Sequence, residues 1–272
     1  MAHVIITGGS SGIGAALAEA CAARGDDVSL IARNQASLRA VRDGLQARFG
    51  AAGNGFHTEA ADVGDGPGIT AAIGRCEATL GSCNTLITSA GIVAPGRFEE
   101  QPANAFEGQI RTNLLGTVNA VRAVYPGMLG RRSGNILMLG SGAGMIGIYG
   151  YTAYCASKYA VAGFAEALRA EARLAGITVS ICFPPDTETP QLAAERPLRP
   201  AEAQSTMGAG GLWAAPDVAR AALAGLDRGQ FAIYPGMQMK MLGMFGSVAM
   251  PFLRQWFDRK ISAARRSSSS ER

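Results

Sequence analysis

The sequence predicts an α/β fold, a doubly wound parallel sheet of about seven strands with helices on both faces. Short apolar runs alternate with longer segments rich in Ala, Leu and Arg, and most of the short runs are continuously apolar, as strands covered on both sides should be. A glycine-rich turn follows the first apolar run. The strands are expected at 3–7, 27–32, 56–61, 84–89, 134–140, 177–183 and 230–234. The helices are expected at about 12–24, 35–48, 67–80, 102–129, 152–175 and 216–227.

Composition narrows the class of protein. The 272 residues are 48% hydrophobic and 17% charged, which fits one large domain and excludes a disordered chain. The net charge of +4 is small and dispersed, so no nucleic-acid partner is expected. Five cysteines include no C-x-x-C pair, and there are two histidines, so neither disulfides nor a metal site is expected.

The chain is expected to form one domain with two irregular regions. Residues 1–235 carry the strand–helix alternation, with a Pro-, Gly- and Ala-rich insertion at about 184–215 that would form a substrate loop. Residues 236–264 form an apolar C-terminal segment, and 265–272 predict a disordered tail. No signal peptide and no apolar run of about 18–20 residues is apparent. These features favour a cytoplasmic protein, with peripheral attachment at the inner face of a membrane left open.

The first strand leads into Thr7-Gly8-Gly9-Ser10-Ser11-Gly12-Ile13-Gly14, which opens the first helix. Glycines let a backbone approach a pyrophosphate closely, and a helix N-terminus offers unpaired N–H groups to it. The strand–turn–helix context therefore predicts a Rossmann-type dinucleotide site rather than a simple tight turn. Its residues are Gly8, Ser10, Ser11, Gly12, Ile13 and Gly14.

The end of the second strand indicates which dinucleotide binds. It reads Ile31-Ala32-Arg33-Asn34, with no acidic residue to accept hydrogen bonds from a ribose 2′-hydroxyl. An arginine there would instead pair with a 2′-phosphate through its planar guanidinium. The prediction is NADPH, with a merely solvated Arg33 as the alternative.

Three later elements carry candidate catalytic residues. Asn113 falls inside the helix expected at 102–129, where asparagine is unfavourable unless the helix is distorted or the side chain is buried and hydrogen-bonded. Ser141 ends the fifth strand, at the edge where a parallel sheet binds ligands. Tyr154 and Lys158 share one face of the helix expected at 152–175, so the ammonium could lower the pKa of the phenol and make Tyr154 a proton donor. A surface tyrosine above a lysine is the alternative.

The glycine spacing G-x-x-x-G-x-G and the order Asn113, Ser141, Tyr154, Lys158 resemble the short-chain dehydrogenase/reductase family. The resemblance covers about residues 3–235. It implies that Asn113 holds a water linked to Lys158, that Ser141 polarises a carbonyl and that Tyr154 protonates it. Tyr154 and Lys158 would also contact the cofactor.

The same resemblance implies further cofactor contacts and an assembly. Asp62 and Val63 would contact the adenine, and Ala90 and Gly91 the bound cofactor, although Ser89 replaces the family's usual asparagine. Pro184, Thr187 and Thr189 would surround the nicotinamide, with Pro185 in place of the usual glycine. The family also implies a homo-oligomer, either a dimer or a tetramer.

A narrower resemblance rests on two stretches, Phe183–Pro190 and Tyr149–Tyr154. They look like the 3-ketosphinganine (3-ketodihydrosphingosine) reductases, which use NADPH to reduce a long-chain amino ketone in sphingolipid biosynthesis. Asp186 and Glu188 could then pair with the substrate ammonium, with simple loop solvation as the alternative.

The C-terminal segment is rich in Met and Phe and ends in basic residues, which suits an acyl chain or a peripheral contact with anionic lipid. An ordinary methionine-rich core or dimer helix is the alternative. Pro251 and nearby glycines argue against one straight spanning helix.

The expected function is therefore NADPH-dependent reduction of a long-chain lipid ketone by hydride transfer. Two alternatives stay open. One is another reductase of the same family, acting on a 3-oxoacyl thioester or a hydroxysteroid. The other is a non-catalytic NADP(H)-binding sensor.

Overall fold

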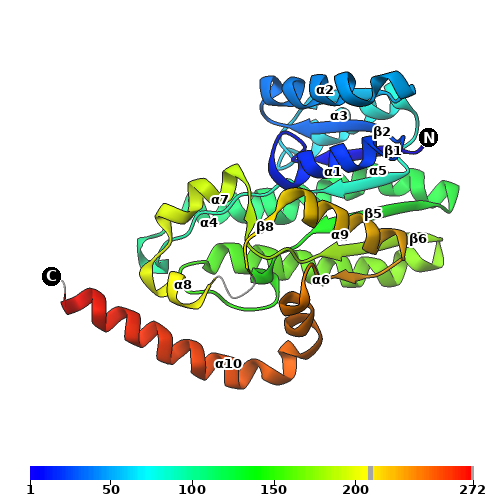
Figure 1. Cartoon of the computed structure of the whole chain (residues 1–272). Helices are drawn as coiled ribbons and strands as arrows, with labels where there is room; N and C mark the ends of the chain where they lie inside the picture. The colour runs from blue at the N-terminus through cyan, green and yellow to red at the C-terminus, as the bar shows by residue number, and fades with distance from the viewer. Residues whose placement is uncertain (208–210, 271–272) are drawn as a thin grey trace.

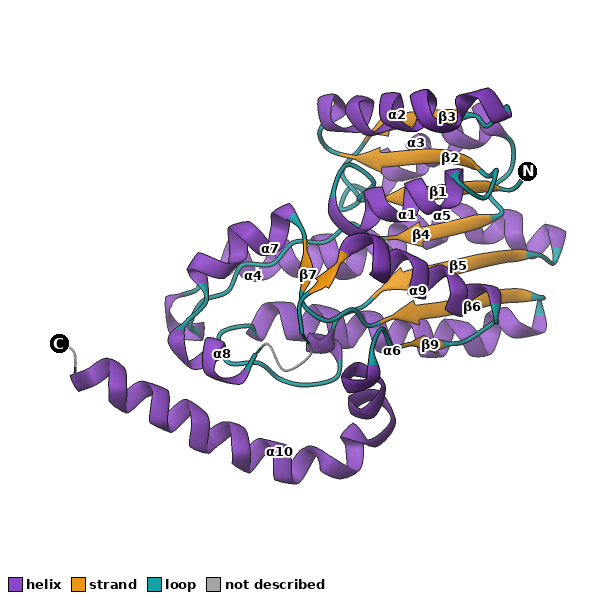
Figure 2. Ribbon diagram, in the orientation of Figure 1, coloured by secondary structure: helices purple, strands orange, loops and turns teal. Residues whose placement is uncertain are grey.

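A computed structural model describes residues 1–207 and 211–270, with side chains as far as residue 266. Its centre is a parallel seven-stranded sheet in the order β3-β2-β1-β4-β5-β6-β9 (Figures 1 and 2). The strands are β1 His3–Thr7, β2 Asp27–Ala32, β3 Phe56–Ala60, β4 Thr85–Thr88, β5 Gly134–Leu139, β6 Ile177–Cys182 and β9 Ala232–Ile233. The predicted doubly wound α/β fold is confirmed.

The sheet is buried on both faces because neighbouring side chains of a strand point to opposite sides. In β1, Val4 and Ile6 belong to one core and Ile5 belongs to the other. The first core is covered by α1 Gly12–Ala22, α2 Gln35–Phe49 and α9 Ala215–Asp227. The second is covered by α3 Gly66–Leu80, α5 Gly116–Arg131 and α6 Thr152–Leu174.

The helix expected at 102–129 is interrupted. It consists of α4 Ala103–Gln109, a π-helical stretch Ile110–Leu115 and α5. Asn113 lies in the π-helical stretch with its side chain buried, so both consequences expected of an asparagine at this position occur together. Short 3₁₀ turns occur at Gly50–Ala52, Phe98–Glu100, Gly142–Gly144 and Arg196–Leu198.

The insertion at about 184–215 is folded in its described part; residues 208–210 lie outside the described residues. It contains β7 Thr187–Glu188, α7 Pro190–Glu195, α8 Ala201–Thr206 and β8 Trp213–Ala214. Strands β7 and β8 pair in parallel, and the Trp213 amide donates to the carbonyl of Asp186 at 2.9 Å. The two ends of the insertion are thereby held together beside the carboxyl ends of the main strands.

The C-terminal segment forms one helix, α10 Met237–Ser270, which leaves the sheet and runs beneath α8 in Figure 1. The helix bends sharply in that view, and it contains Gly243, Gly246 and Pro251, residue types at which helices kink. Most of the stretch predicted as a disordered tail is therefore helical, and residues 271–272 lie outside the described residues. Among the described helices, none combines the length and hydropathy needed to cross a membrane.

Candidate active site

Two adjoining cavities lie at the carboxyl ends of the strands, where the strand order reverses between β1 and β4. The glycine-loop groove, about 310 Å³, is bordered by the turn after β1. The tyrosine cavity, about 460 Å³, contains Tyr154. Both are lined in part by Ile13, Ser89, Gly91, Thr189 and Gln191, so they are contiguous.

The glycine loop is closely packed, and its glycines are needed for that reason. A Cβ on Gly14 would lie 2.2 Å from the carbonyl oxygen of Gly8. Gly8 has a φ of +72°, and a Cβ there would lie 2.6 Å from the Ala90 amide nitrogen. Gly12, with a φ of +54°, faces the Thr189 side chain. The backbone can therefore bring the N-terminus of α1 directly to the groove, as a pyrophosphate site requires.

The structure gathers the predicted dinucleotide residues around this groove. Its lining includes Gly8, Ser10, Ser11, Gly12, Ile13, Gly14, Arg33, Asp62, Val63, Ala90 and Gly91. Arg33 is exposed at the end of β2, where the sequence places it. The groove also contains residues that the sequence did not indicate, namely Ala32, Asn34, Ala61, Ile92 and Thr112. All five are chain neighbours of predicted site residues, and Thr112 precedes Asn113 in the π-helical stretch.

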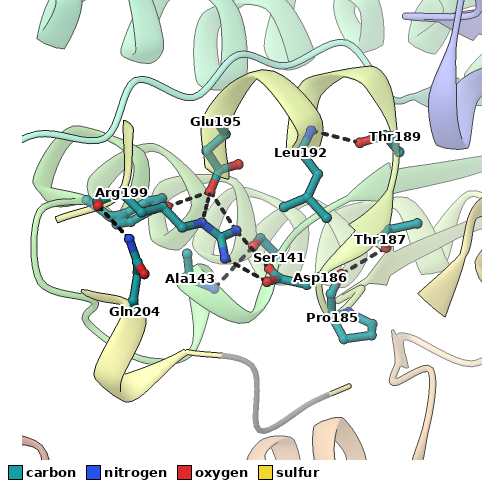
Figure 3. A network of polar contacts seen from close by, with 11 residues as sticks. Ser141, Ala143, Pro185, Asp186, Thr187, Thr189, Leu192, Glu195, Arg199 and Gln204 are labelled. Carbon is teal, nitrogen blue, oxygen red and sulfur yellow. Dashed lines mark hydrogen bonds and ion pairs between the residues drawn. The ribbon is translucent and has the colours of Figure 1, made fainter. Parts of the chain in front are cut away.

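Ser141, Tyr154 and Lys158 meet in the tyrosine cavity. Ser141 follows β5 and accepts a hydrogen bond from the Ala143 amide at 3.2 Å (Figure 3). Lys158 is buried and donates from Nζ to the carbonyl of Leu139 at 2.8 Å. Its Nζ lies 5.7 Å from the centroid of the Tyr154 ring.

Burial dominates the ionisation of both groups. It raises the pKa of Tyr154 to about 12, although a hydrogen bond with Ser141 lowers it in part. It lowers the pKa of Lys158 to about 8. The expectation of a phenol made acidic by the ammonium is therefore wrong for this structure. At pH 7 the phenol is protonated and the amine carries its charge, which is the ionisation state of a proton donor beside a cation.

Asn113 lines neither cavity and is only 1% exposed. Its Nδ2 donates to the Ile92 carbonyl and to Ser157 Oγ, both at 2.9 Å, and its Oδ1 accepts from the Ile92 amide at 2.8 Å. The side chain thus ties the loop after β4 to α6, the helix that carries Tyr154 and Lys158. The water implied by the family resemblance stays a prediction.

The loop after β6 brings Pro184, Thr187 and Thr189 to the tyrosine cavity, and the nicotinamide contact that the resemblance implies stays a prediction. Thr187 donates to the Pro185 carbonyl at 2.9 Å, and Thr189 caps α7 by accepting from the Leu192 amide at 3.1 Å (Figure 3). The two acidic residues of this loop differ. Asp186 lines the cavity but forms an ion pair with Arg199, and Glu188 is exposed and outside the lining.

One face of α10 forms an apolar wall of the tyrosine cavity. Its residues there are Met239, Leu242, Leu253, Trp256 and Phe257. The Met- and Phe-rich composition indicated such a surface, but nothing in the sequence showed that the helix would fold back to the site. Tyr151 and Glu195 also line the cavity and were missed, Glu195 because no element was assigned within the insertion.

Known proteins give an independent comparison. Residues 2–199 match the model of the short chain dehydrogenase family. A mouse 3-ketodihydrosphingosine reductase is 37% identical over 74% of this chain, and the match spans 61% of the mouse protein. A zebrafish (Danio rerio) 3-dehydrosphinganine reductase is 35% identical over 85% of this chain and 70% of its own length.

The fold has solved relatives as well. A short-chain dehydrogenase from Sphingobium yanoikuyae, solved in complex with NADPH, superposes with a TM-score of 0.79. It is 27% identical, and the match covers 94% of this chain and 96% of that one. The family match over residues 2–199 is consistent with the glycine loop and with the cluster of Ser141, Tyr154 and Lys158. This chain belongs to the short-chain dehydrogenase family.

Proposed function

We propose that the chain is an NADPH-dependent reductase of a long-chain ketone, with 3-ketosphinganine as the substrate and sphinganine as the product. The observation that carries this proposal is the tyrosine cavity itself. It combines Ser141, Tyr154 and Lys158 with an apolar wall from α10, and it adjoins the glycine-loop groove. A small polar ketone would leave that wall without a partner.

The groove fits NADPH in shape and in charge. Added Cβ atoms at Gly8 and Gly14 would collide with backbone, so glycine is needed for the tight turn that brings the N-terminus of α1 to the groove. Ser10, Ser11 and the N-terminus of α1 would hold the pyrophosphate, and Arg33 would pair with the 2′-phosphate. The cofactor supplies a hydride to the carbonyl carbon of the substrate.

The side chains of this protein have separate tasks around the substrate carbonyl. Tyr154, protonated at neutral pH, donates its proton to the carbonyl oxygen, and Ser141 binds the same oxygen through its hydroxyl. Lys158 keeps a positive charge beside the ring and favours the phenolate that remains after donation. Asn113 acts as a positioning residue, because its amide joins the loop after β4 to α6.

The names of the mouse and zebrafish relatives support the choice of substrate. The wall formed by α10 supports a long alkyl chain independently, because burying methylene groups against Met, Leu and aromatic side chains is favourable by about 0.8 kcal/mol each. A 3-oxoacyl thioester or steroid reductase would share the catalytic side chains and differ in what occupies this wall.

A side-by-side assay of NADPH oxidation tests the proposal. The purified protein would be given 3-ketosphinganine, a 3-oxoacyl thioester and a steroid ketone, and kcat/KM would be compared. We expect 3-ketosphinganine to exceed both others by at least about tenfold, which corresponds to about 1.4 kcal/mol. A preference for the thioester or the steroid would refute the proposed substrate, and no turnover of any ketone would favour an NADP(H)-binding sensor.

We also propose peripheral attachment of α10 to an anionic membrane surface. Its outer face exposes Met241, Phe245, Val248 and Phe252 at helical spacing, and basic residues follow towards the C-terminus. Co-sedimentation with phosphatidylglycerol vesicles, and not with phosphatidylcholine vesicles, would support the attachment. The homo-oligomer, dimer or tetramer, stays a prediction that light scattering would test.

A further inference from the structure

One side of the tyrosine cavity is acidic. Among its described lining residues, the charged side chains are Lys158, Asp186 and Glu195. Arg199 forms ion pairs with both carboxylates but is absent from the lining, so the cavity contacts the acids and not their cation. Lys158 is committed elsewhere, to the carbonyl of Leu139 and the ring of Tyr154.

Arg199 is shared unequally between the two acids (Figure 3). Asp186 binds it with both oxygens, Oδ2 to Nη1 at 2.9 Å and Oδ1 to Nη2 at 3.2 Å. Glu195 uses only Oε1, which accepts from Nε at 3.0 Å and Nη2 at 2.8 Å and also from the Tyr151 hydroxyl at 2.5 Å. The bidentate pair balances one acid against the guanidinium, so the network keeps one negative charge in excess.

One oxygen of this negatively charged network, Oε2 of Glu195, remains available to a ligand in the cavity. No hydrogen bond from a described residue reaches Oε2 of Glu195, although its side chain is only 10% exposed. Because Glu195 lines the cavity, this oxygen is open to a cationic ligand there, and a charge-assisted hydrogen bond to it would be favourable.

The same acid lies close to the reacting group. Tyr151, which donates to Glu195, packs edge-on against Tyr154 with ring centroids 6.2 Å apart. Burial is the main cause of the raised pKa of Tyr154, but the charges of Glu195 and Asp186 add to it. Glu195 and Tyr154 line the same cavity, so a cation at Glu195 would share it with a carbonyl that is bound at the Tyr154 hydroxyl.

The proposed substrate carries its amine on the carbon next to the carbonyl carbon, so ammonium and carbonyl must bind side by side. We propose that Glu195 is the residue that binds this ammonium and makes the site selective for α-amino ketones over neutral ketones. Asp186 and Arg199 hold its carboxylate in place. This inference rests on the proposed reductase function and moves ammonium recognition from the acids expected in the sequence, Asp186 and Glu188, to α7.

Glu195→Gln tests the inference, because it removes the charge and keeps an oxygen for Tyr151 and Arg199. KM would be measured for 3-ketosphinganine and for a neutral long-chain ketone of matched length. We expect the variant to raise KM for the amino ketone by about 10- to 100-fold and KM for the neutral ketone by less than about threefold. Equal changes for the two substrates would overturn the inference.

The matched control is Glu188→Gln, which removes the same charge from the same insertion at an exposed position outside the cavity. It should leave the ratio of the two KM values unchanged. A shift like that of Glu195→Gln would show that the rise in KM comes from the general loss of negative charge and not from ammonium binding at Glu195. NADPH binding and thermal unfolding would show that both variants fold.

A measurement on the unaltered protein does not depend on any variant. A long-chain primary amine should inhibit reduction of the neutral ketone at least about tenfold more strongly than the alcohol of equal length. Equal inhibition would contradict an ammonium site. If the unaltered protein reduced neutral ketones or thioesters but not 3-ketosphinganine, the proposed substrate would fail instead, whatever the inhibition showed.

Discussion

Burial shifts the pKa values of Tyr154 and Lys158 in opposite directions. It keeps the phenol of Tyr154 protonated at neutral pH and brings the pKa of Lys158 down to about 8, close to the working range of an enzyme. The proton to be donated is therefore held firmly, while the neighbouring cation can be lost by a modest rise in pH.

This difference predicts the pH dependence of reduction. As pH rises through about 8, Lys158 loses its proton and the positive charge that favours the phenolate, so kcat/KM should fall with a midpoint near that value. A neutral ketone is the substrate of choice, because its own charge does not change. In Lys158→Arg, whose guanidinium keeps its charge, the residual activity should lack this decline. If kcat/KM of that variant declined with the same midpoint, the titrating group would be one other than Lys158.

Arg33 determines the choice of cofactor in our account. Arg33→Asp replaces a cation with an anion at the end of β2, so the 2′-phosphate would be repelled. We expect kcat/KM for NADPH to fall by about 100-fold and that for NADH to fall by less than about threefold. Steady-state kinetics with both cofactors checks this, and a parallel loss with both would show that Arg33 acts on folding or on shared contacts.

At the scale of an element, the glycine loop and α1 act as one unit. Gly14→Ala should disturb both, because the added Cβ would lie 2.2 Å from the carbonyl oxygen of Gly8. We expect a loss of stability of about 1–3 kcal/mol and at least about tenfold weaker NADPH binding. Gly44→Ala in α2 is the control, since a Cβ there meets nothing within 4 Å and alanine favours helix. Chemical denaturation and NADPH titration would compare the two.

The two faces of α10 should be separable by mutation. Leu253 lines the tyrosine cavity, and its chain neighbour Phe252 is 76% exposed on the outer face. Leu253→Ala should raise KM for a long-chain ketone about tenfold and leave KM for a short-chain ketone unchanged, because apolar contact with the alkyl chain is lost. Phe252→Ala should leave both KM values unchanged and weaken vesicle binding. If Phe252→Ala changed KM for the long-chain ketone and Leu253→Ala weakened vesicle binding, our assignment of the two faces would be wrong.

The sequence predicted those elements whose signal is local. Continuous apolar runs identified the buried strands, and the glycine spacing and the Tyr154–Lys158 pair identified both ends of the site. The π-helical break around Asn113 was foreseen only as a distortion, since its form depends on hydrogen bonds to Ile92 and Ser157 made across the fold. Glu195 could not be foreseen, because its importance comes from Arg199 and Tyr151, which only the folded insertion brings to it.

At the scale of the whole molecule, stability should depend on one buried histidine near the opposite end of the sheet. In β1, His3 Nδ1 donates to the Gly81 carbonyl at 2.6 Å, and Nε2 contacts Ser29 Oγ of β2 at 2.8 Å. Burial lowers the pKa of His3 below its usual 6.5, so the folded protein holds the neutral ring.

Acidification should therefore destabilise the fold through His3. Its contribution is complete above pH of about 6.5 and is lost as pH falls below that value, because the unfolded chain takes up the proton first. The loss is at most about 1.4 kcal/mol per pH unit. Urea unfolding between about pH 5.5 and 7.5 would measure it, and His3→Asn should show a shallower slope by that amount. Identical slopes would show that His3 does not cause the pH dependence of the unfolding free energy.

Winding a parallel sheet in both directions brings together side chains that lie far apart in the chain. The glycine loop, the end of β5, the start of α6 and the inner face of α10 all reach the same edge. Fold and chemistry are linked in this way, because the crevice exists only when all of these elements are in place.

The most direct measurement compares unaltered protein with Tyr154→Phe in two assays, NADPH-dependent turnover of 3-ketosphinganine and equilibrium NADPH binding. If Tyr154 donates the proton, the variant loses at least about a thousandfold in kcat and binds NADPH within about twofold of the unaltered protein. Retained turnover in a variant that is folded and binds NADPH would contradict the account, since a group other than Tyr154 would then protonate the ketone.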